Sequence, residues 1–365
     1  MTTAQLNTPN QTFDDTRQAV FENRFMQALN EGGMLQLVSL GHRTGLFNHM
    51  ADGEPVTCSE LARRSRLNER YVREWLGGLT VSGILDHEAE VMTYRLPPEH
   101  ASLLTDSGDA NLAVFAQYIP LLGQVEDDVL DSFKHGKGVH YDKYHRFHEV
   151  MAEDSGQTVL PALFDAILPL APELTERLES GIRVLDLGCG RGMALMKMAE
   201  RFPASHFEGY DLSADAIAWA REHASRHGLK NVAFEIQDLS DFDVTAEKEK
   251  FDCVTTFDAI HDQAYPLKLL QGIRNTLKSN GVYLAQDIHA SSHHHHDRDH
   301  PLGPLLYTIS IMHCMSVSLA QGGEGLGTMW GRERARDYFT RAGFSSVEVH
   351  QLPHDIQNDY WVLRP

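Results

Sequence analysis

The sequence predicts two folded parts, an α-rich winged-helix domain followed by an α/β domain with a mostly parallel sheet. Three observations predict this arrangement. The chain has 365 residues, which exceeds the usual size of one hydrophobic core. A pattern of helix, turn, helix and hairpin lies within its first hundred residues. From Gly181 onward, apolar β-rich runs alternate with helical stretches, which indicates βα units.

The N-terminal domain is expected over residues 1–110. Residues 21–50 read as helices with Gly45 closing the last turn, residues 56–62 start a short helix, and Asn68 caps the next one. The buried stripe of this second helix consists of Val72, Leu76 and Leu79. Two short strands are expected after it, at residues 84–87 and 92–96. Together these elements make a winged helix-turn-helix.

Charge decides what this winged module is expected to do. Residues 57–96 hold six arginines and six acidic residues, so the module has no net charge, and the whole chain carries −19. A protein that reads DNA needs a basic stripe to hold phosphates. We therefore expect no nucleic-acid partner, and a scaffold that forms a homodimer through the N-terminal domain.

Composition indicates an ordinary folded protein of a reducing compartment. Apolar residues make up 42% of the chain and charged residues 23%. The four cysteines lack CxxC spacing and are typical of reduced, buried thiols. The N-terminus lacks the apolar run of a secretory signal. Residues 305–320 are expected to be too short and too rich in Ser, Thr and His to cross a bilayer. A cytoplasmic protein without a membrane partner is the expectation.

Residues 111–180 are expected to form a helical connector or lid. The helices are interrupted by a turn around 135–140 that contains Gly and His. Phe147, Val150 and Met151 share helical spacing, which most often means core packing. The segment must also connect the two domains, and it is placed to roof a cleft.

The third predicted part, residues 181–365, opens with a strand that runs into a glycine-rich turn. Asp186 precedes Gly188, Gly190 and Gly192 in the spacing G-x-G-x-G, and a helix follows. Glycines are needed there because side chains would keep the backbone from closing on a ligand at the helix N-terminus. A dinucleotide site would instead use G-x-G-x-x-G.

Two more acidic residues end the next two predicted strands. Asp211 follows the strand 206–210, where a carboxylate is placed to accept both ribose hydroxyls of an adenosine ligand. Asp238 and Leu239 follow the strand 232–236 and offer a carboxylate and a backbone N–H to an adenine ring. Carboxyl ends of adjacent parallel strands line the crevice of a doubly wound sheet.

In this order, the motifs resemble the pattern of class I methyltransferases, which use S-adenosylmethionine as cofactor. The resemblance covers residues 181–365 and implies a Rossmann-like fold with a mostly parallel seven-stranded sheet. It also implies the cofactor contacts: Gly188, Gly190 and Gly192 under the methionine part, Asp186 near the amino group, Asp211 and Leu212 at the ribose, Asp238 and Leu239 at the adenine, and Phe257 at the end of the fourth strand.

The order of winged helix, helical connector and catalytic domain is similar to that of dimeric small-molecule O-methyltransferases. His261-Asp262 falls where that family carries its His-Asp pair, which implies that His261 is the general base. Asp287 ends the fifth predicted strand and is placed to orient the imidazole. The family has Trp where this chain has Gln263, which puts the substrate pocket in doubt.

The insertion 288–332 is longer than a connection needs to be, and it is expected to build a lid or pocket wall. Its candidate substrate-side residues are Tyr307, His313, Cys314 and Trp330. The His-rich loop 293–300 contains competent zinc ligands, but adjacent histidines in a loop rarely converge on one ion. No metal is predicted.

The sequence therefore predicts methyl transfer from S-adenosylmethionine to a small-molecule acceptor, with a hydroxyl as the preferred acceptor because of His261. Two alternatives remain open at this point. One is a thiol or sulfide S-methyltransferase, since a thiol needs less help from a base. The other is a non-catalytic regulator that senses the cofactor and reads DNA with its winged helix.

Overall fold

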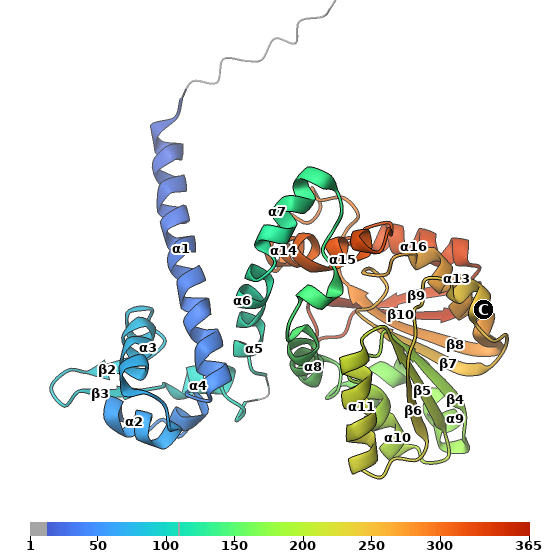
Figure 1. Ribbon diagram of the computed structural model, residues 1–365, viewed down its shortest axis with the longest axis horizontal. Helices are drawn as coiled ribbons and strands as arrows, with labels where there is room; N and C mark the ends of the chain where they lie inside the picture. The colour runs from blue at the N-terminus through green and yellow to red at the C-terminus, as the bar shows by residue number, and fades with distance from the viewer. Residues whose placement is uncertain (1–12, 109) are drawn as a thin grey trace, which may run out of the picture. The chain divides into compact units, whose positions relative to one another are not determined.

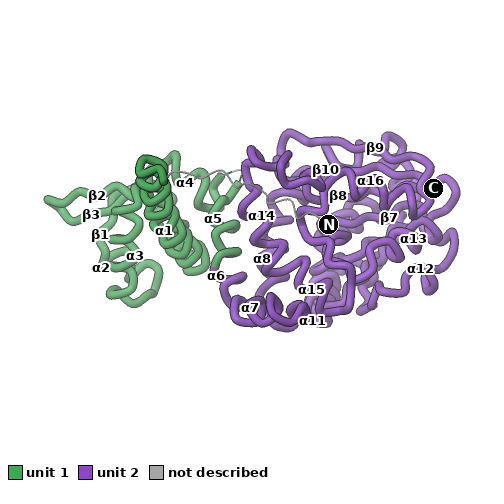
Figure 2. The backbone as a smooth tube through the Cα atoms, turned by 90° about the horizontal axis from the view of Figure 1, so that it is seen from above, with its two compact units in different colours: residues 1–119 green, residues 120–365 purple. Residues whose placement is uncertain are grey.

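The computed structural model describes residues 13–108 and 110–365, and the chain divides into two compact units (Figure 1). Residues 1–119 form the first unit and residues 120–365 the second (Figure 2). Most of the predicted connector thus belongs to the same unit as the sheet. The finer boundaries after residues 110 and 180 stay predictions.

A long helix, α1 (Asp15–Thr44), opens the first unit and begins earlier than the expected residue 21. Asp14 explains this start, because its side chain accepts a hydrogen bond from the Arg17 backbone N–H and caps the helix. Gly45 ends the helix at φ 71°, a left-handed conformation that favours glycine.

A winged helix-turn-helix follows α1, as the sequence predicts. Its helices are α2 (Cys58–Ser65), α3 (Glu69–Val81), α4 (Pro98–Leu104) and α5 (Ala113–Ala116), and its antiparallel strands lie in the order β1 (Val56–Thr57), β3 (Thr93–Arg95), β2 (Asp86–Glu88). The expectation of a helix from residue 56 is wrong. Thr57 pairs with β3 through its backbone and caps α2 through its hydroxyl, so the helix begins at Cys58.

The second unit is built on a seven-stranded, mostly parallel sheet. Its strand order is β6 (Val232–Ile236), β5 (His206–Asp211), β4 (Arg183–Leu187), β7 (Phe251–Phe257), β8 (Leu277–Ile288), β10 (Asn358–Arg364), β9 (Ser346–His350). Strands β4 to β8 pair in parallel, and β10 runs antiparallel to both of its neighbours. This arrangement confirms the predicted fold class.

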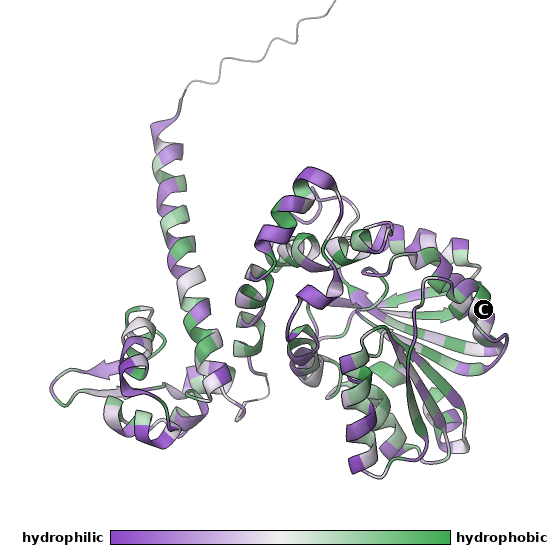
Figure 3. Ribbon diagram, viewed as in Figure 1, coloured by the Kyte–Doolittle hydropathy of each residue, from purple (hydrophilic) through white to green (hydrophobic). Residues whose placement is uncertain are grey.

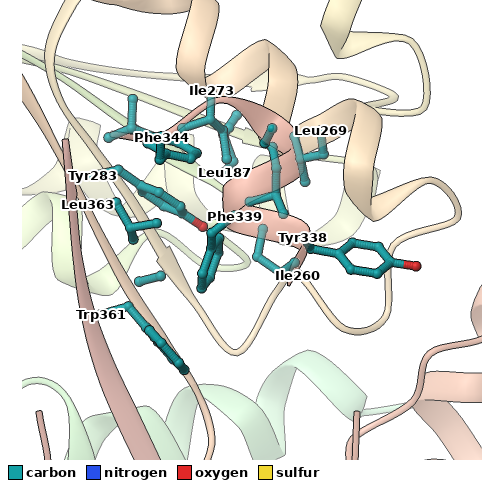
Figure 4. Packing of buried hydrophobic residues seen from close by; sticks show 14 of the residues in the cluster. Leu187, Ile260, Leu269, Ile273, Tyr283, Tyr338, Phe339, Phe344, Trp361 and Leu363 are labelled. Carbon is teal, nitrogen blue, oxygen red and sulfur yellow. The ribbon is translucent and has the colours of Figure 1, made fainter. Parts of the chain in front are cut away.

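Helices cover both faces of the sheet, and each face has its own hydrophobic core. One core joins the strands to α12 (Phe242–Thr245), α13 (Pro266–Thr276) and α16 (Gly331–Ala342). Figure 4 shows the aromatic centre of this core, where Phe339 meets Trp361 edge-on at 5.2 Å between ring centroids. The other core packs the strands on α9 (Leu174–Ser180), α10 (Met193–Arg201) and α11 (Ala214–Arg226).

The strands are largely hydrophobic (Figure 3), as expected when both faces of a parallel sheet are covered. The remaining helices of the unit are α6 (Tyr118–Gly123), α7 (Glu126–His135), α8 (Phe147–Thr158), α14 (Gly303–Ile309) and α15 (Met315–Ala320).

Residues 303–320 form one helical stretch, with a π-helical turn at Ser310–Cys314 between α14 and α15. Contrary to the sequence-based expectation, this stretch is long and apolar enough to span a membrane by length and composition. In the described chain it packs inside the second unit, where Leu306, His313 and Val317 are buried. Burial of its apolar residues within the protein accounts for its composition.

Candidate active site

The glycine-rich turn between β4 and α10 needs its glycines for two separate reasons. Gly188, Gly190 and Gly192 have φ values of 71°, 53° and 67°, which side chains disfavour. Space is also short, because a Cβ on Gly192 would lie 2.2 Å from the Phe234 ring. The turn can therefore bring its backbone against a ligand in a way that other residues would prevent.

Asp211, at the end of β5, holds this turn in place through a hydrogen bond. Its Oδ2 accepts a hydrogen bond of 2.8 Å from the Gly190 N–H, and its Oδ1 accepts one of 2.8 Å from the Ser213 N–H. The carboxylate thus fixes the central glycine of the turn. Its remaining acceptor capacity is free to meet a ligand, because a carboxylate offers about four acceptor sites.

Asp186 lies near the end of β4 and is only 3% exposed. Burial raises the pKa of its carboxyl group to about 7, although a 2.8 Å hydrogen bond from the Thr255 hydroxyl opposes this rise. A buried carboxyl group of this kind becomes fully ionised when a cation binds beside it. An amino group is a suitable partner.

A cavity with a volume of about 1200 Å³, part of it open to solvent, lies over these strand ends. Every residue predicted to contact the cofactor lines it: Asp186, Gly188, Gly190, Gly192, Asp211, Leu212, Asp238, Leu239 and Phe257. The structure therefore brings together, around one space, residues that are up to 71 positions apart in the sequence.

The facing wall of the cavity comes from α8 and the segment before it, which sequence reasoning treated as connector. Tyr141, Phe147, His148 and Met151 line the space. Burial lowers the pKa of His148, so this ring is neutral near pH 7. The helical spacing of the apolar residues was the only signal for this wall, and it is also the signal of core packing.

His261 lies in the turn after β7 and pairs with Asp287 near the end of β8. The His261 Nδ1 donates to Asp287 Oδ1 at 2.7 Å, and both residues are buried. The same oxygen accepts from the Trp330 Nε1–H at 3.0 Å and from the Ile288 N–H at 2.8 Å. Asp287 is thus held by three donors, and it fixes the orientation of the imidazole ring.

Two opposing effects set the charge on His261. Burial lowers the pKa of its imidazole, but the adjacent Asp287 carboxylate and Cys314 thiol outweigh burial and hold the pKa well above its ordinary value. His261 itself is not among the cavity-lining residues, whereas Asp258, Asp262 and Gln263 on either side of it are.

The four predicted substrate-side residues do not line the cavity. Tyr307 is 37% exposed, and Trp330 is buried where it bonds Asp287. His313 stacks on Phe147, with 3.7 Å between ring centroids, and Cys314 lies beside it. Val317 of α15 and Gln321, directly after this helix, line the cavity instead.

The His-rich loop 293–300 lies away from the cavity lining, and part of it bonds its own surroundings. The His300 Nε2 donates to the His289 carbonyl at 2.8 Å. In the described part of the chain, the His, Cys, Asp and Glu side chains close enough to share an ion are those of Asp258, His261 and Asp287, with ligand atoms within 4.8 Å of one another. In this group the His261 nitrogen and an Asp287 oxygen already bond each other.

Family models match both units of the chain. Residues 178–317 match a methyltransferase domain, and residues 32–106 match a winged helix-turn-helix domain of the Rv2258c-like type. Curated relatives include a ubiquinone biosynthesis O-methyltransferase of Glaesserella parasuis, 30% identical over 115 residues, and a mitochondrial one of Candida albicans, 33% identical over 110 residues. The first match covers 31% of this chain and 48% of the relative, and the second 29% and 33%. The chain thus spans half or less of these relatives.

Solved structures share the fold over nearly the whole chain. A putative O-methyltransferase from Nostoc punctiforme superposes with a TM-score of 0.69 at 17% identity, covering 97% of this chain and 100% of that one. Human N-acetylserotonin methyltransferase in complex with S-adenosylmethionine gives 0.66 at 18% identity, covering 97% and 99%. The chain therefore carries a methyltransferase domain of Rossmann-like fold behind a winged helix-turn-helix domain, which is the architecture of S-adenosylmethionine-dependent methyltransferases.

Proposed function

We propose that this protein transfers the methyl group of S-adenosylmethionine to a hydroxyl group of a small molecule, with His261 as general base. The observation that carries the proposal is the cavity. It is lined by the glycine turn and by carboxylates at three strand ends, and it extends to the residues that flank His261. The O-methyltransferases among the relatives support the choice of oxygen as the acceptor atom.

The chain contributes binding, orientation and proton transfer. When bound, S-adenosylmethionine supplies a methyl group activated by a sulfonium. Asp186, Asp211 and Asp238 would hold its amino, ribose and adenine groups. A hydroxyl oxygen forms the new O–C bond as the C–S bond breaks, with the electron pair going to sulfur, and the hydroxyl proton passes to His261. Asp287 stabilises the resulting imidazolium.

A calorimetric titration of the full-length protein tests the cofactor half of the proposal. At pH 8, S-adenosylhomocysteine should bind with measurable heat and NAD should not. Because the Asp186 pKa of about 7 must fall when an ammonium group binds, binding releases close to one proton at pH 6 and little at pH 8. The affinity should therefore be about tenfold lower at pH 6 than at pH 8.

Asp186→Asn should remove this pH dependence, because the amide does not titrate. Binding of NAD in place of S-adenosylhomocysteine would contradict the assigned cofactor. The acceptor half is tested with tritiated S-adenosylmethionine and a panel of phenols, amines and thiols, in which label should move to the phenols.

The winged domain supports a scaffold role better than DNA reading. Five of its arginines are engaged by acidic side chains of the same module: Arg63 and Arg64 with Glu60, Arg70 with Glu74, Arg73 with Glu69, and Arg95 with Asp86. Arginines that are already paired with carboxylates contribute little to phosphate binding.

We also place the protein in the cytoplasm, because all four cysteines are unpaired, although Cys58 and Cys189 are less buried than expected.

We propose that α1 forms a homodimer interface. Phe21, Phe25 and Leu29 recur every four residues, so they share one face of the helix, and all three are more than half exposed. In Figure 3, hydrophobic segments recur along this helix between hydrophilic ones. Exposed large apolar side chains gathered on one face often mark an association surface.

Phe25→Glu should therefore convert a dimer to a monomer, because a charge at the centre of an apolar interface is left without a partner. Light scattering coupled to size exclusion would give twice the 41.0 kDa chain mass for the wild type and a single mass for the variant. Val81→Glu on α3, at a side chain that is 87% exposed, is the matched control and should stay dimeric. A monomeric wild type would refute the interface.

A further inference from the structure

Asp258 has an unusual backbone conformation directly after β7. Its φ is 51°, in the left-handed region that non-glycine residues rarely adopt. The Asp258 N–H donates to the Gln286 carbonyl at 3.0 Å, which holds this residue against β8. Strain of this kind is concentrated at functional sites. The conformation brings the Asp258 side chain to the cavity, which it lines.

The Asp258 carboxyl group connects the cavity to the buried pair. Its oxygen lies within 4.8 Å of the ligand atoms of both His261 and Asp287. His261 is 3% exposed and does not line the cavity, so a ligand in this structure would meet Asp258 before the imidazole. Asp258 thus lines the cavity and also lies beside the pair.

Two buried oxygens in this group lack hydrogen-bond partners. They are Asp258 Oδ1 and Asp287 Oδ2, and Asp287 is only 2% exposed. Buried acceptors are normally satisfied, so unsatisfied ones at a cavity indicate a catalytic or binding role. A proton on the Asp258 carboxyl group would supply the missing donor.

The charges around Asp258 favour such a proton. Burial raises the pKa of Asp258 well above its ordinary value. Asp287, Asp355 and Asp154 raise the pKa further, and His261 lowers it. The carboxyl group therefore holds a proton more readily than an ordinary aspartate, and in its protonated form it has one O–H to donate and one oxygen to accept.

We propose that Asp258 is a catalytic residue that faces the acceptor hydroxyl and relays its proton to His261. The proposal rests on the proposed function. In the step, which requires the imidazole to have lost its proton, protonated Asp258 gives its own proton to His261 and receives the acceptor proton on its other oxygen. The O–C bond forms and the C–S bond breaks, with the electron pair going to sulfur. At the end of the step Asp258 is protonated again, and His261 is an imidazolium beside Asp287.

Asp258→Asn is the first test, because an amide keeps the size of the side chain but cannot relay a proton. With the acceptor found in the tritium screen, kcat should fall by roughly ten- to a hundredfold with little change in KM. The double variant Asp258→Asn, His261→Ala should be no slower than His261→Ala alone, because the two residues act in one chain. S-adenosylhomocysteine affinity should stay unchanged.

Asp258→Gly separates the chemistry from the backbone strain. Glycine adopts φ 51° freely, so this variant should melt no lower than the wild type while it loses the same activity as Asp258→Asn. The relay is overturned if Asp258→Asn keeps kcat within twofold, or if the two substitutions act additively. It is also overturned if EDTA abolishes turnover and a divalent cation restores it. A wild type that binds cofactor but methylates nothing overturns the proposed function as well.

Discussion

His261→Ala should lower kcat for a hydroxyl acceptor by about a thousandfold, within the range that general base catalysis supplies. A hydroxyl group is weakly acidic, so its oxygen attacks slowly unless a base takes the proton. The fold should survive the substitution. Asp287 keeps two of its three donors, the Trp330 and Ile288 N–H groups, so its buried carboxylate does not become wholly unpaired.

Initial rates with tritiated S-adenosylmethionine give this comparison, with His227→Ala as the control. His227 is exposed and caps the C-terminal end of α11, where its Nδ1 bonds the His223 carbonyl, so kcat should not change. A loss of less than tenfold in His261→Ala would instead favour a thiol acceptor, which is already partly ionised near neutral pH.

The raised pKa of His261 predicts a characteristic pH profile. The imidazole must be neutral to accept a proton, and the Asp287 carboxylate stabilises its charged form. The wild-type rate should therefore rise with pH above neutrality, and this rise should be absent in His261→Ala. Stability should change in the opposite sense. The ion pair of His261 with Asp287 stabilises the fold fully below the unfolded pKa of histidine, about 6.5. This contribution is lost as pH rises through the higher pKa that His261 has in the folded protein.

The sheet could be predicted because its signals are local. A buried parallel strand is a short apolar run, and the acid or glycine that ends it lies next to it in the sequence. Hence β5 and β6 begin at the expected residues, 206 and 232, and the residues predicted around Asp186 and Asp211 meet at one cavity. Parallel strands bring their carboxyl ends to one edge whatever the length of the connections.

The acceptor side could not be predicted, because nothing local specifies it. Phe147 and His148 reach the cavity from a helix whose apolar spacing looks like that of any packed helix. The π-helical turn at Ser310–Cys314 adds a residue to one turn, and no sequence rule would have placed it. No signal in the sequence singles out Asp258, because an acid directly after a strand is common. Its role depends on a positive φ and on two neighbours 3 and 29 positions away.

Asp211→Ala should weaken the binding of S-adenosylhomocysteine by at least about a hundredfold, for two reasons that add. The substitution removes a carboxylate that would accept hydrogen bonds from both ribose hydroxyls, and bonds to a charged group contribute roughly 1.5–3 kcal/mol each. It also frees the Gly190 N–H, which Asp211 holds at 2.8 Å, so the glycine turn loses the contact that fixes its centre.

Asp215→Asn is the matched control, since it removes one negative charge four residues further on, at an exposed position of α11. Calorimetry at pH 8 should give this control the wild-type dissociation constant. Circular dichroism should show the same helix content for both variants, because Asp211 lies at a strand end and contributes no side chain to either hydrophobic core of the sheet. If Asp211→Ala bound S-adenosylhomocysteine as tightly as the control, the ribose would have to lie elsewhere in the cavity. The assignment of Asp186 to the amino group would then fail with it, because both positions follow from one placement of the ligand along the strand ends.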